Sequence, residues 1–147
     1  MTANEESPSL VVRRTIPISR ERVFDAWLDP ARLARFMRPG GIVRTTAEVD
    51  PHVGGRFRIV MTHAGSEPEE VEHTGEYLLI ERPERLSFTW RSVHTDNTPT
   101  VVTIEFHERG TSTEVVLTHR GLPARTTESH RKGWGDILQT LGDKAMA

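Results

Sequence analysis

Histidine is the residue type with the widest chemical repertoire in this sequence, because its side chain can bind metals, transfer protons and orient polar ligands near neutral pH. The chain contains seven histidines. No two of them show the i, i+4 spacing of a helical metal site or an HExxH pattern, so no metal centre is predicted. His119 shares the alternating parity of Val115 and Leu117, so we expect it to point inward, near His130. Such a pair could bind a polar ligand group, act as a general acid or base, or be hydrogen-bonded structural residues.

Other catalytic chemistries lack their characteristic residues. The sequence has no cysteine, which excludes disulfides, thiolate nucleophiles and sulfur-ligated metal sites. No G-x-S-x-G element surrounds a serine, so covalent hydrolysis is not expected. Gly54-Gly55 lacks the lysine and the strand-to-helix context of a phosphate-binding loop and is interpreted as a turn or bulge. The residues predict no cofactor and no catalytic set, although they leave chemistry at His119 open.

Length and charge favour one globular domain. The chain has 147 residues, 35% of them hydrophobic, which suits a single core, and we assign residues 9–147 to one domain after a disordered tail over residues 1–8. The formal net charge of −2 gives no general attraction to phosphate backbones, so nucleic acid is not an expected partner. No stretch has the length and hydrophobicity of a membrane span or a secretory signal. We therefore expect a cytoplasmic protein.

Hydrophobic alternation with a period of two dominates the sequence between Ile42 and Arg120 and predicts β-strands. The links between these segments are short and contain Pro, Gly, Asn or Asp, so the strands are expected to be antiparallel neighbours. One face of the sheet is apolar, and the segment from Tyr77 to Ile80 is apolar on both parities, which suggests either a bulge or contacts on both faces. The predicted strands are Leu10 to Ile18, Ile42 to Val49, Val53 to Thr62, Glu70 to Glu81, Arg85 to Arg91, Thr100 to His107 and Ser112 to Arg120.

Three segments have helical spacing instead. Ser19 is a candidate N-cap for a short helix from Arg22 to Leu28, and Pro30 can open a second that ends before Pro39. The segment from Thr126 to Ala147 predicts a long amphipathic helix that covers the apolar sheet face. Glycine is costly inside a helix, so Gly133 suggests a close approach of this helix to the sheet.

Five motifs in order carry a resemblance to a known family. They are RERVFDAWLDPARLARFMRPGG from Arg20, VDPHVGGRFRIVM from Val49, GEYLLIERPERLSFTW from Gly75, EVVLTHRGLP from Glu114 and HRKGWGDILQTL from His130. Together they resemble the Bet v 1-like (START-like, SRPBCC) superfamily and, within it, the group named for homology to the activator of the Hsp90 ATPase. The resemblance implies an α+β helix-grip fold, in which a curved seven-stranded antiparallel sheet wraps a long C-terminal helix and two short helices follow the first strand.

The resemblance also implies a cavity between the sheet and the last helix. In this superfamily such a cavity commonly holds an apolar or amphipathic small molecule, so the leading hypothesis is a small-molecule binding protein. Apolar burial would supply most of the affinity, and His119 would be the polar anchor. The residues predicted to bind the ligand are Phe57, Ile59, Met61, Phe88, Trp90, Ile104, Phe106, Leu117, His119, Trp134 and Leu138.

Two other functions remain open. The family resemblance suggests a co-chaperone that acts on the Hsp90 ATPase, although only the C-terminal module of the activator proper is matched. The superfamily also contains cavity enzymes with cyclase, dehydratase or hydrolase-like chemistry, for which His119 would be the reacting group. The mostly apolar inward face favours binding over catalysis.

Overall fold

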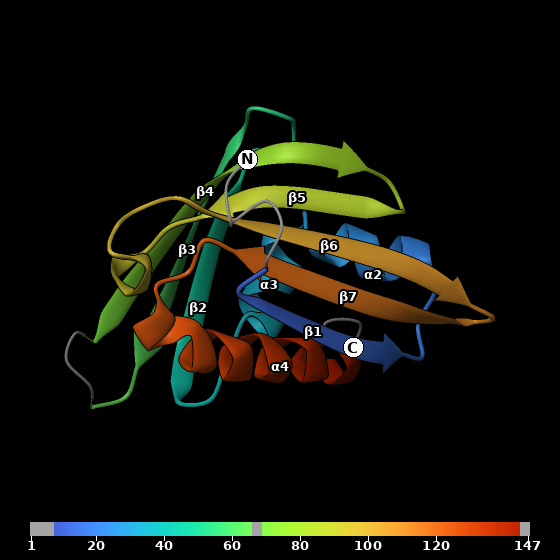
Figure 1. Ribbon diagram of the computed structural model, residues 1–147. Coiled ribbons are helices and arrows are strands. Elements are labelled where there is room, and N and C mark those ends of the chain that lie inside the picture. Colours follow the sequence, from blue (N-terminus) through green and yellow to red (C-terminus); the bar gives the residue numbers. More distant parts are fainter. Residues whose placement is uncertain (1–7, 66–68, 145–147) are drawn as a thin grey trace.

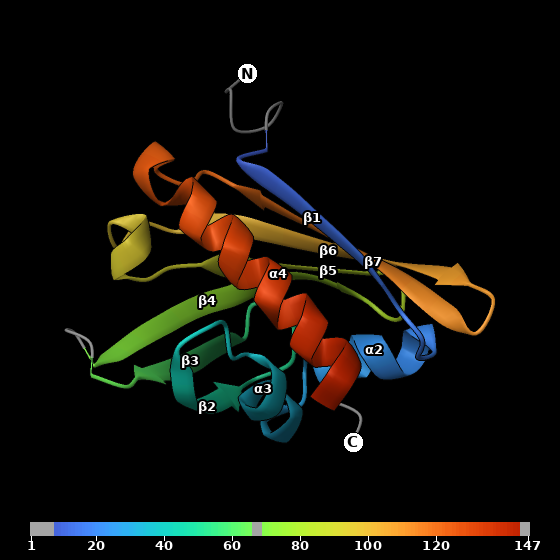
Figure 2. The same cartoon turned by 90° about the horizontal axis from the view of Figure 1, so that it is seen from below.

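The protein is described by a computed structural model, which places residues 8–65 and 69–144. Seven strands form one antiparallel sheet in the order β1-β7-β6-β5-β4-β3-β2, and the sheet curls around a long helix, α4 (Figures 1 and 2). Figure 2 shows α4 running obliquely across the concave face, with the short helices α2 and α3 closing one end. This is the predicted α+β helix-grip fold.

The elements follow each other through short links. Their bounds are β1 (Leu10–Ile16), α2 (Arg20–Ala26), α3 (Pro30–Phe36), β2 (Ile42–Val49), β3 (Arg56–His63), β4 (Glu70–Glu81), β5 (Arg85–Trp90), the 3-10 turn η1 (Val93–Thr95), β6 (Thr100–Arg109), β7 (Ser112–Arg120), the 3-10 turn η2 (Ala124–Thr126) and α4 (Thr127–Lys144). The predicted tail falls almost entirely outside the described residues, and so does the end of the predicted last helix. No helix in the described ranges is long and apolar enough to cross a membrane.

Local chemistry explains where the short elements begin. Asp29 caps α3, since its Oδ1 atom accepts hydrogen bonds from the backbone N–H groups of Ala31 (2.9 Å) and Arg32 (3.4 Å), and Pro30 occupies the first turn. Ser19 precedes α2, but its side chain makes no capping hydrogen bond, so the expected cap is absent. The helix instead begins at Arg20 and is stabilised by packing of Val23 and Phe24.

Glycine permits two tight features of the sheet. Gly54 has a φ of +87°, and a Cβ at Gly55 would lie 2.2 Å from the carbonyl oxygen of Asp50, which confirms the predicted turn. In β4, a Cβ at Gly75 would lie 2.0 Å from the carbonyl oxygen of Thr89. The pairing of β4 with β5 shifts register between Tyr77 and Leu79, where a bulge was predicted.

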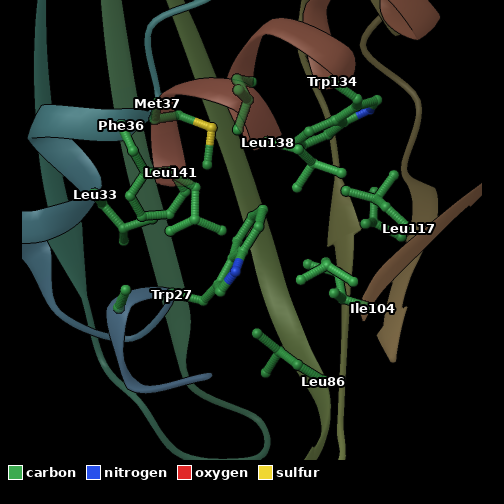
Figure 3. Packing of buried hydrophobic residues seen from close by; sticks show 14 of the residues in the cluster. Trp27, Leu33, Phe36, Met37, Leu86, Ile104, Leu117, Trp134, Leu138 and Leu141 are labelled. Atoms are coloured by element: carbon green, nitrogen blue, oxygen red, sulfur yellow. The ribbon is translucent and has the colours of Figure 1, made fainter. Parts of the chain in front are cut away.

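The core lies between the concave sheet face and the helices. Its side chains come from alternate positions of the strands and from one face of each helix, as the periodicity predicted. Figure 3 shows Leu33 and Phe36 of α3, and Met37 directly after it, next to Leu138 and Leu141 of α4. Leu86, Ile104 and Leu117 of the sheet lie opposite. The apolar face of α4 is therefore buried, which anchors the helix across the sheet.

Candidate functional site

A pocket of about 300 Å³ lies at the N-terminal half of α4, between that helix and the β2–β5 side of the sheet. The sheet contributes residues near the ends of β2, β3, β4 and β5, and α4 contributes one of its faces. The link at Pro39-Gly40 and the turn η1 complete the edge of the pocket. The lining residues are Pro39, Gly40, Ile42, Met61, His63, Val71, His73, Trp90, His94, Ser129, His130, Lys132, Gly133, Trp134, Asp136 and Ile137. Most of its surface is apolar, and four of its sixteen lining residues are histidines.

Aromatic rings form one wall. The His73 ring stacks on Trp90, with ring centroids 4.8 Å apart and an interplanar angle of 29°. Trp90 in turn lies 5.0 Å from the ring of Trp134 on α4, so the contact bridges sheet and helix. Both tryptophans are buried. Their packing fixes the shape of this wall, because each ring is held by the next.

His73 is the least satisfied polar side chain of the wall. It is 7% exposed, and its Nδ1 atom has no hydrogen-bond partner among the described residues. Burial lowers the pKa of His73 to about 4, an effect that the nearby backbone of Ile59 offsets only in part. At neutral pH the ring is therefore uncharged, with one N–H donor and one acceptor nitrogen.

His130 has a defined tautomer. Its Nδ1 lies 2.8 Å from the carbonyl oxygen of Thr126, one turn earlier in the chain, so Nδ1 carries the proton and donates it. This leaves Nε2 as an acceptor on a ring that lines the pocket. Burial lowers the pKa of His130, and His94 lowers it further, while the Thr126 carbonyl opposes both. The pKa of His94 is also lowered, mainly by burial and then by His63 and Arg125.

A hydrogen-bonded ion pair marks the rim. The Lys132 ammonium lies 3.4 Å from Oδ2 of Asp136, and the same oxygen accepts a 3.0 Å hydrogen bond from the backbone N–H of Gly40. The Asp136 carboxylate is thus already occupied by a cation and an amide. The pair ties α4 to the link between α3 and β2, while the exposed Lys132 head stays at the surface.

His119 lies behind this wall rather than in it. The indole N–H of Trp134 donates to His119 Nδ1 over 3.0 Å, so the ring proton lies on Nε2 and is donated to Thr100 Oγ1 at 2.7 Å. The Thr100 hydroxyl donates onward to the carbonyl oxygen of Trp90 at 2.6 Å. Burial lowers the pKa of His119 to about 3. Both ring nitrogens are used inside the core, and the chain of hydrogen bonds orients Trp134.

The residues predicted from the sequence divide between the pocket and the core. Met61, Trp90 and Trp134 line the pocket. The other predicted residues are buried outside its lining, in or directly behind the core: Phe57, Ile59, Phe88, Ile104, Phe106, Leu117, His119 and Leu138. A direct role for these residues in binding stays a prediction.

Sequence reasoning considered His130 together with His119 as a possible binding pair, and of these two His130 lines the pocket. It missed most of the other lining residues, including His73 and Ile137. His73 occupies an inward position of β4, opposite Ile59 of β3, and that parity was the available signal. Gly133 also lines the pocket, where a Cβ would lie 3.7 Å from the Cβ of Pro39. The close approach expected for this glycine is therefore to the Pro39 link and not to a strand.

The pocket wall can make both apolar contacts and hydrogen bonds. No group of three or more acidic, histidine or cysteine side chains in residues 8–65 and 69–144 is placed to hold a metal ion. Uncharged histidines in an apolar wall can hydrogen-bond a polar group while the tryptophans and aliphatic side chains contact the remainder.

Similarity to known proteins agrees with this fold. The family model described as "Activator of Hsp90 ATPase homolog 1-like protein" matches residues 17–144. No curated protein has a sequence that matches the chain.

Several solved structures share the architecture. Protein CV1439 from Chromobacterium violaceum has a TM-score of 0.81 at 24% identity, over 94% of this chain and 96% of that chain. An HSP90 activator from Plasmodium falciparum, PFC0360w, has a TM-score of 0.71 at 25% identity, over 90% and 91%. CalU16 from Micromonospora echinospora has a TM-score of 0.68 at 21% identity, over 92% of this chain and 74% of that chain. The helix-grip fold and the match over residues 17–144 place this chain in the family of Activator of Hsp90 ATPase homolog 1-like proteins.

Proposed function

We propose that this protein binds a small amphipathic molecule in the pocket between the N-terminal half of α4 and strands β2–β5. The observation that carries the proposal is a pocket of about 300 Å³ whose lining combines Trp90, Trp134 and Ile137 with uncharged histidines. Its volume falls at the lower end of the roughly 300–1,000 Å³ typical of ligand pockets, which favours a compact molecule over a long-chain lipid.

The proposal gives the predicted residues two kinds of role. Met61, Trp90 and Trp134 contact the ligand directly, since they line the pocket. His119 is a positioning residue, because its Nδ1 accepts the Trp134 indole N–H and thereby fixes that ring. The buried strand residues behind the wall support its shape. Affinity comes mainly from apolar burial, at about 25 cal/mol per Å² before the costs of immobilisation.

NMR mapping with small aromatic probes tests this function. Naphthalene should shift the signals of the Trp90 and Trp134 indoles and the Ile137 methyls, and leave Phe106, buried in the core, unchanged. Val71→Phe should abolish the shifts, because Val71 lines the pocket and the larger ring occupies its space. Leu78→Phe adds the same ring at an exposed position of β4 and should leave binding intact. Equal binding to both variants would exclude this pocket as the site.

A second candidate function is activation of an Hsp90 ATPase. It is supported by the family match and by the likeness to the Plasmodium falciparum HSP90 activator at 25% identity. Purified protein should then increase ATP turnover by Hsp90 from the same cell, and Val71→Phe should not affect that increase if the pocket plays no part. An unchanged turnover would rule out this candidate and leave the binding proposal untouched.

A further inference from the structure

We infer that Thr100, which does not line the pocket, is a positioning residue for ligand binding: through His119 it holds the indole of Trp134 in the orientation that an aromatic ligand contacts. The inference rests on the proposed binding function and adds a residue behind the pocket wall to the determinants of affinity. It is drawn from a chain of hydrogen bonds that leaves α4, passes through β7 and β6, and ends at the backbone of β5.

The two ends of this chain fix the direction of every hydrogen bond in it. The indole N–H of Trp134 can only donate, and the carbonyl oxygen of Trp90 can only accept. His119 Nδ1 must therefore accept from Trp134, which places the ring proton on Nε2. Thr100 Oγ1, at 2.7 Å, accepts that proton and passes its own to Trp90 at 2.6 Å. The Thr100 hydroxyl thus selects the His119 tautomer that can receive the indole of Trp134.

Burial leaves this tautomer without an alternative partner. Thr100, His119 and Trp134 are each at most 2% exposed, so bulk solvent does not supply substitute hydrogen bonds. Burial also lowers the pKa of His119 to about 3, so at neutral pH the ring carries a single proton. Without the hydroxyl, a proton on Nε2 would lose its acceptor, and a proton on Nδ1 would face the Trp134 N–H. Either state leaves a buried donor unpaired.

The same chain joins the two tryptophans of the pocket wall. Trp90 and Trp134 both line the pocket, and their ring centroids are 5.0 Å apart. The hydrogen bonds lead from the Trp134 ring back to the backbone of Trp90, so they close a loop with the contact between the rings. Removal of the Thr100 hydroxyl opens this loop and leaves the Trp134 ring held by packing alone. A ligand must then order that ring when it binds, which lowers the affinity.

Isothermal titration with naphthalene tests the inference on variants of Thr100. Thr100→Val keeps the shape of the side chain but removes the hydroxyl. We expect it to bind naphthalene about threefold to tenfold more weakly, which is the cost of ordering about one side chain. Thr100→Ser keeps the hydroxyl and should bind within about a factor of two of the unsubstituted protein. Should Thr100→Val not fold, Thr100→Cys carries a weakly hydrogen-bonding thiol and should bind more weakly than Thr100→Ser.

Thr113→Val is the matched control. Thr113 is also buried, and its hydroxyl also donates to a backbone carbonyl, that of Ile18 at 2.7 Å. It lies at the opposite end of β7 from His119 and outside the pocket lining. This variant should therefore lose stability without losing affinity for naphthalene.

Nuclear magnetic resonance adds a readout that a merely structural hydroxyl would not move. In the unsubstituted protein at neutral pH, the ¹⁵N resonances of His119 should show a proton on Nε2 and none on Nδ1. In Thr100→Val, the Trp134 indole N–H signal should broaden or split, because its acceptor is no longer fixed. In Thr113→Val, that signal should stay unchanged.

The outcomes separate the inference from the function. Unchanged affinity for naphthalene in Thr100→Val would overturn the inference and leave the binding function standing. An equal loss of affinity in Thr113→Val would do the same, because affinity would then follow overall stability. A His119 ring protonated on Nδ1 would also overturn the inference alone. If naphthalene does not bind even to the unsubstituted protein, the binding function and the inference fail together.

Discussion

The two halves of α4 lie in contrasting surroundings. The pocket end, defined here by His73, Trp90, His130 and Trp134, combines a cavity with histidines in its lining. The packed end, defined by Leu33, Phe36, Leu138 and Leu141, has apolar side chains in mutual contact beneath α3 (Figure 3). The N-terminal half of α4 therefore lines the pocket, and its C-terminal half packs in the core.

The difference shows how a small fold can keep a pocket that is unfavourable for stability, because packing elsewhere offsets the cost. At the packed end, burial of Phe36 and Leu141 supplies free energy that is independent of any ligand. That free energy can offset the cost of burying His73 Nδ1 with no hydrogen-bond partner among the described residues. The comparison predicts that the pocket end is sensitive to protonation and ligands, while the packed end is sensitive to lost volume.

Acid should produce the largest effect, about half of it from His73 at the pocket end and the rest from His119, which lies behind the pocket wall. The pKa values of His73 and His119 are lowered to about 4 and about 3, below the ordinary value of 6.5 that applies after unfolding. The unfolded state therefore binds more protons below pH 6.5. The histidine contribution to stability is complete above pH 6.5 and falls by about 1.4 kcal/mol per pH unit for each histidine as the pH drops toward 4. We expect a loss on the order of 5 kcal/mol between pH 6.5 and 4.5, measurable by urea unfolding.

His73→Phe separates the two histidines in that experiment. The variant should lose roughly half of the acid dependence that His73 and His119 produce together, because His119 still gains a proton on unfolding in this range. His94 and His130, whose pKa values are also lowered, keep their contributions in the variant. His52→Phe, at an exposed site, should keep the whole dependence. An identical loss in the original protein and in His73→Phe would show that the pocket end is not the acid-sensitive region.

Leu141→Ala should have the next largest effect, through the packed end alone. The Leu141 side chain is fully buried, so truncation removes its apolar contacts and leaves a cavity, which costs about 3 kcal/mol of unfolding free energy. Affinity for naphthalene should stay within a factor of two. Met61→Ala is the comparison variant: Met61 already borders open space, so its truncation should cost less stability and alter probe binding more. The reverse pattern would contradict the division between the two ends.

Most of the fold could be predicted from the sequence, because the alternation of apolar residues shows which side chains of each strand are buried. Phe57, Ile59 and Met61 alternate, as do Val102, Ile104 and Phe106, and all are buried in the structure. Several strand ends differed from expectation. The third strand begins at Arg56 and not at Val53, since the turn around Gly54 and Gly55 takes up the preceding residues.

The site was less predictable because alternation tells which side chains face inward but not where they leave space. Phe106 and Met61 have the same pattern, yet only Met61 lines the pocket. His119 was expected as the polar anchor from its parity, but parity does not reveal that Trp134 and Thr100 use both of its nitrogens. The parity of His73 on its strand gave a signal that it faces inward, but only the three-dimensional contacts show that its Nδ1 has no hydrogen-bond partner among the described residues.

A pair of glycines gives the smallest and most local test of the comparison. Gly133 and Gly135 both lie inside α4, where alanine is favoured over glycine by up to about 1 kcal/mol, so each Gly→Ala variant should raise the melting temperature by about 3 °C. The added methyl at Gly133 would sit 3.7 Å from Pro39 in the pocket lining, an ordinary contact that folding tolerates, whereas at Gly135 it would meet no described atom within 4 Å. Gly133→Ala should therefore weaken naphthalene binding, and Gly135→Ala should not, although the gain in stability is the same. Equal affinities in the two variants would mean that the Pro39 side of the pocket does not contact the probe. The binding surface at the pocket end would then consist only of the aromatic wall around His73.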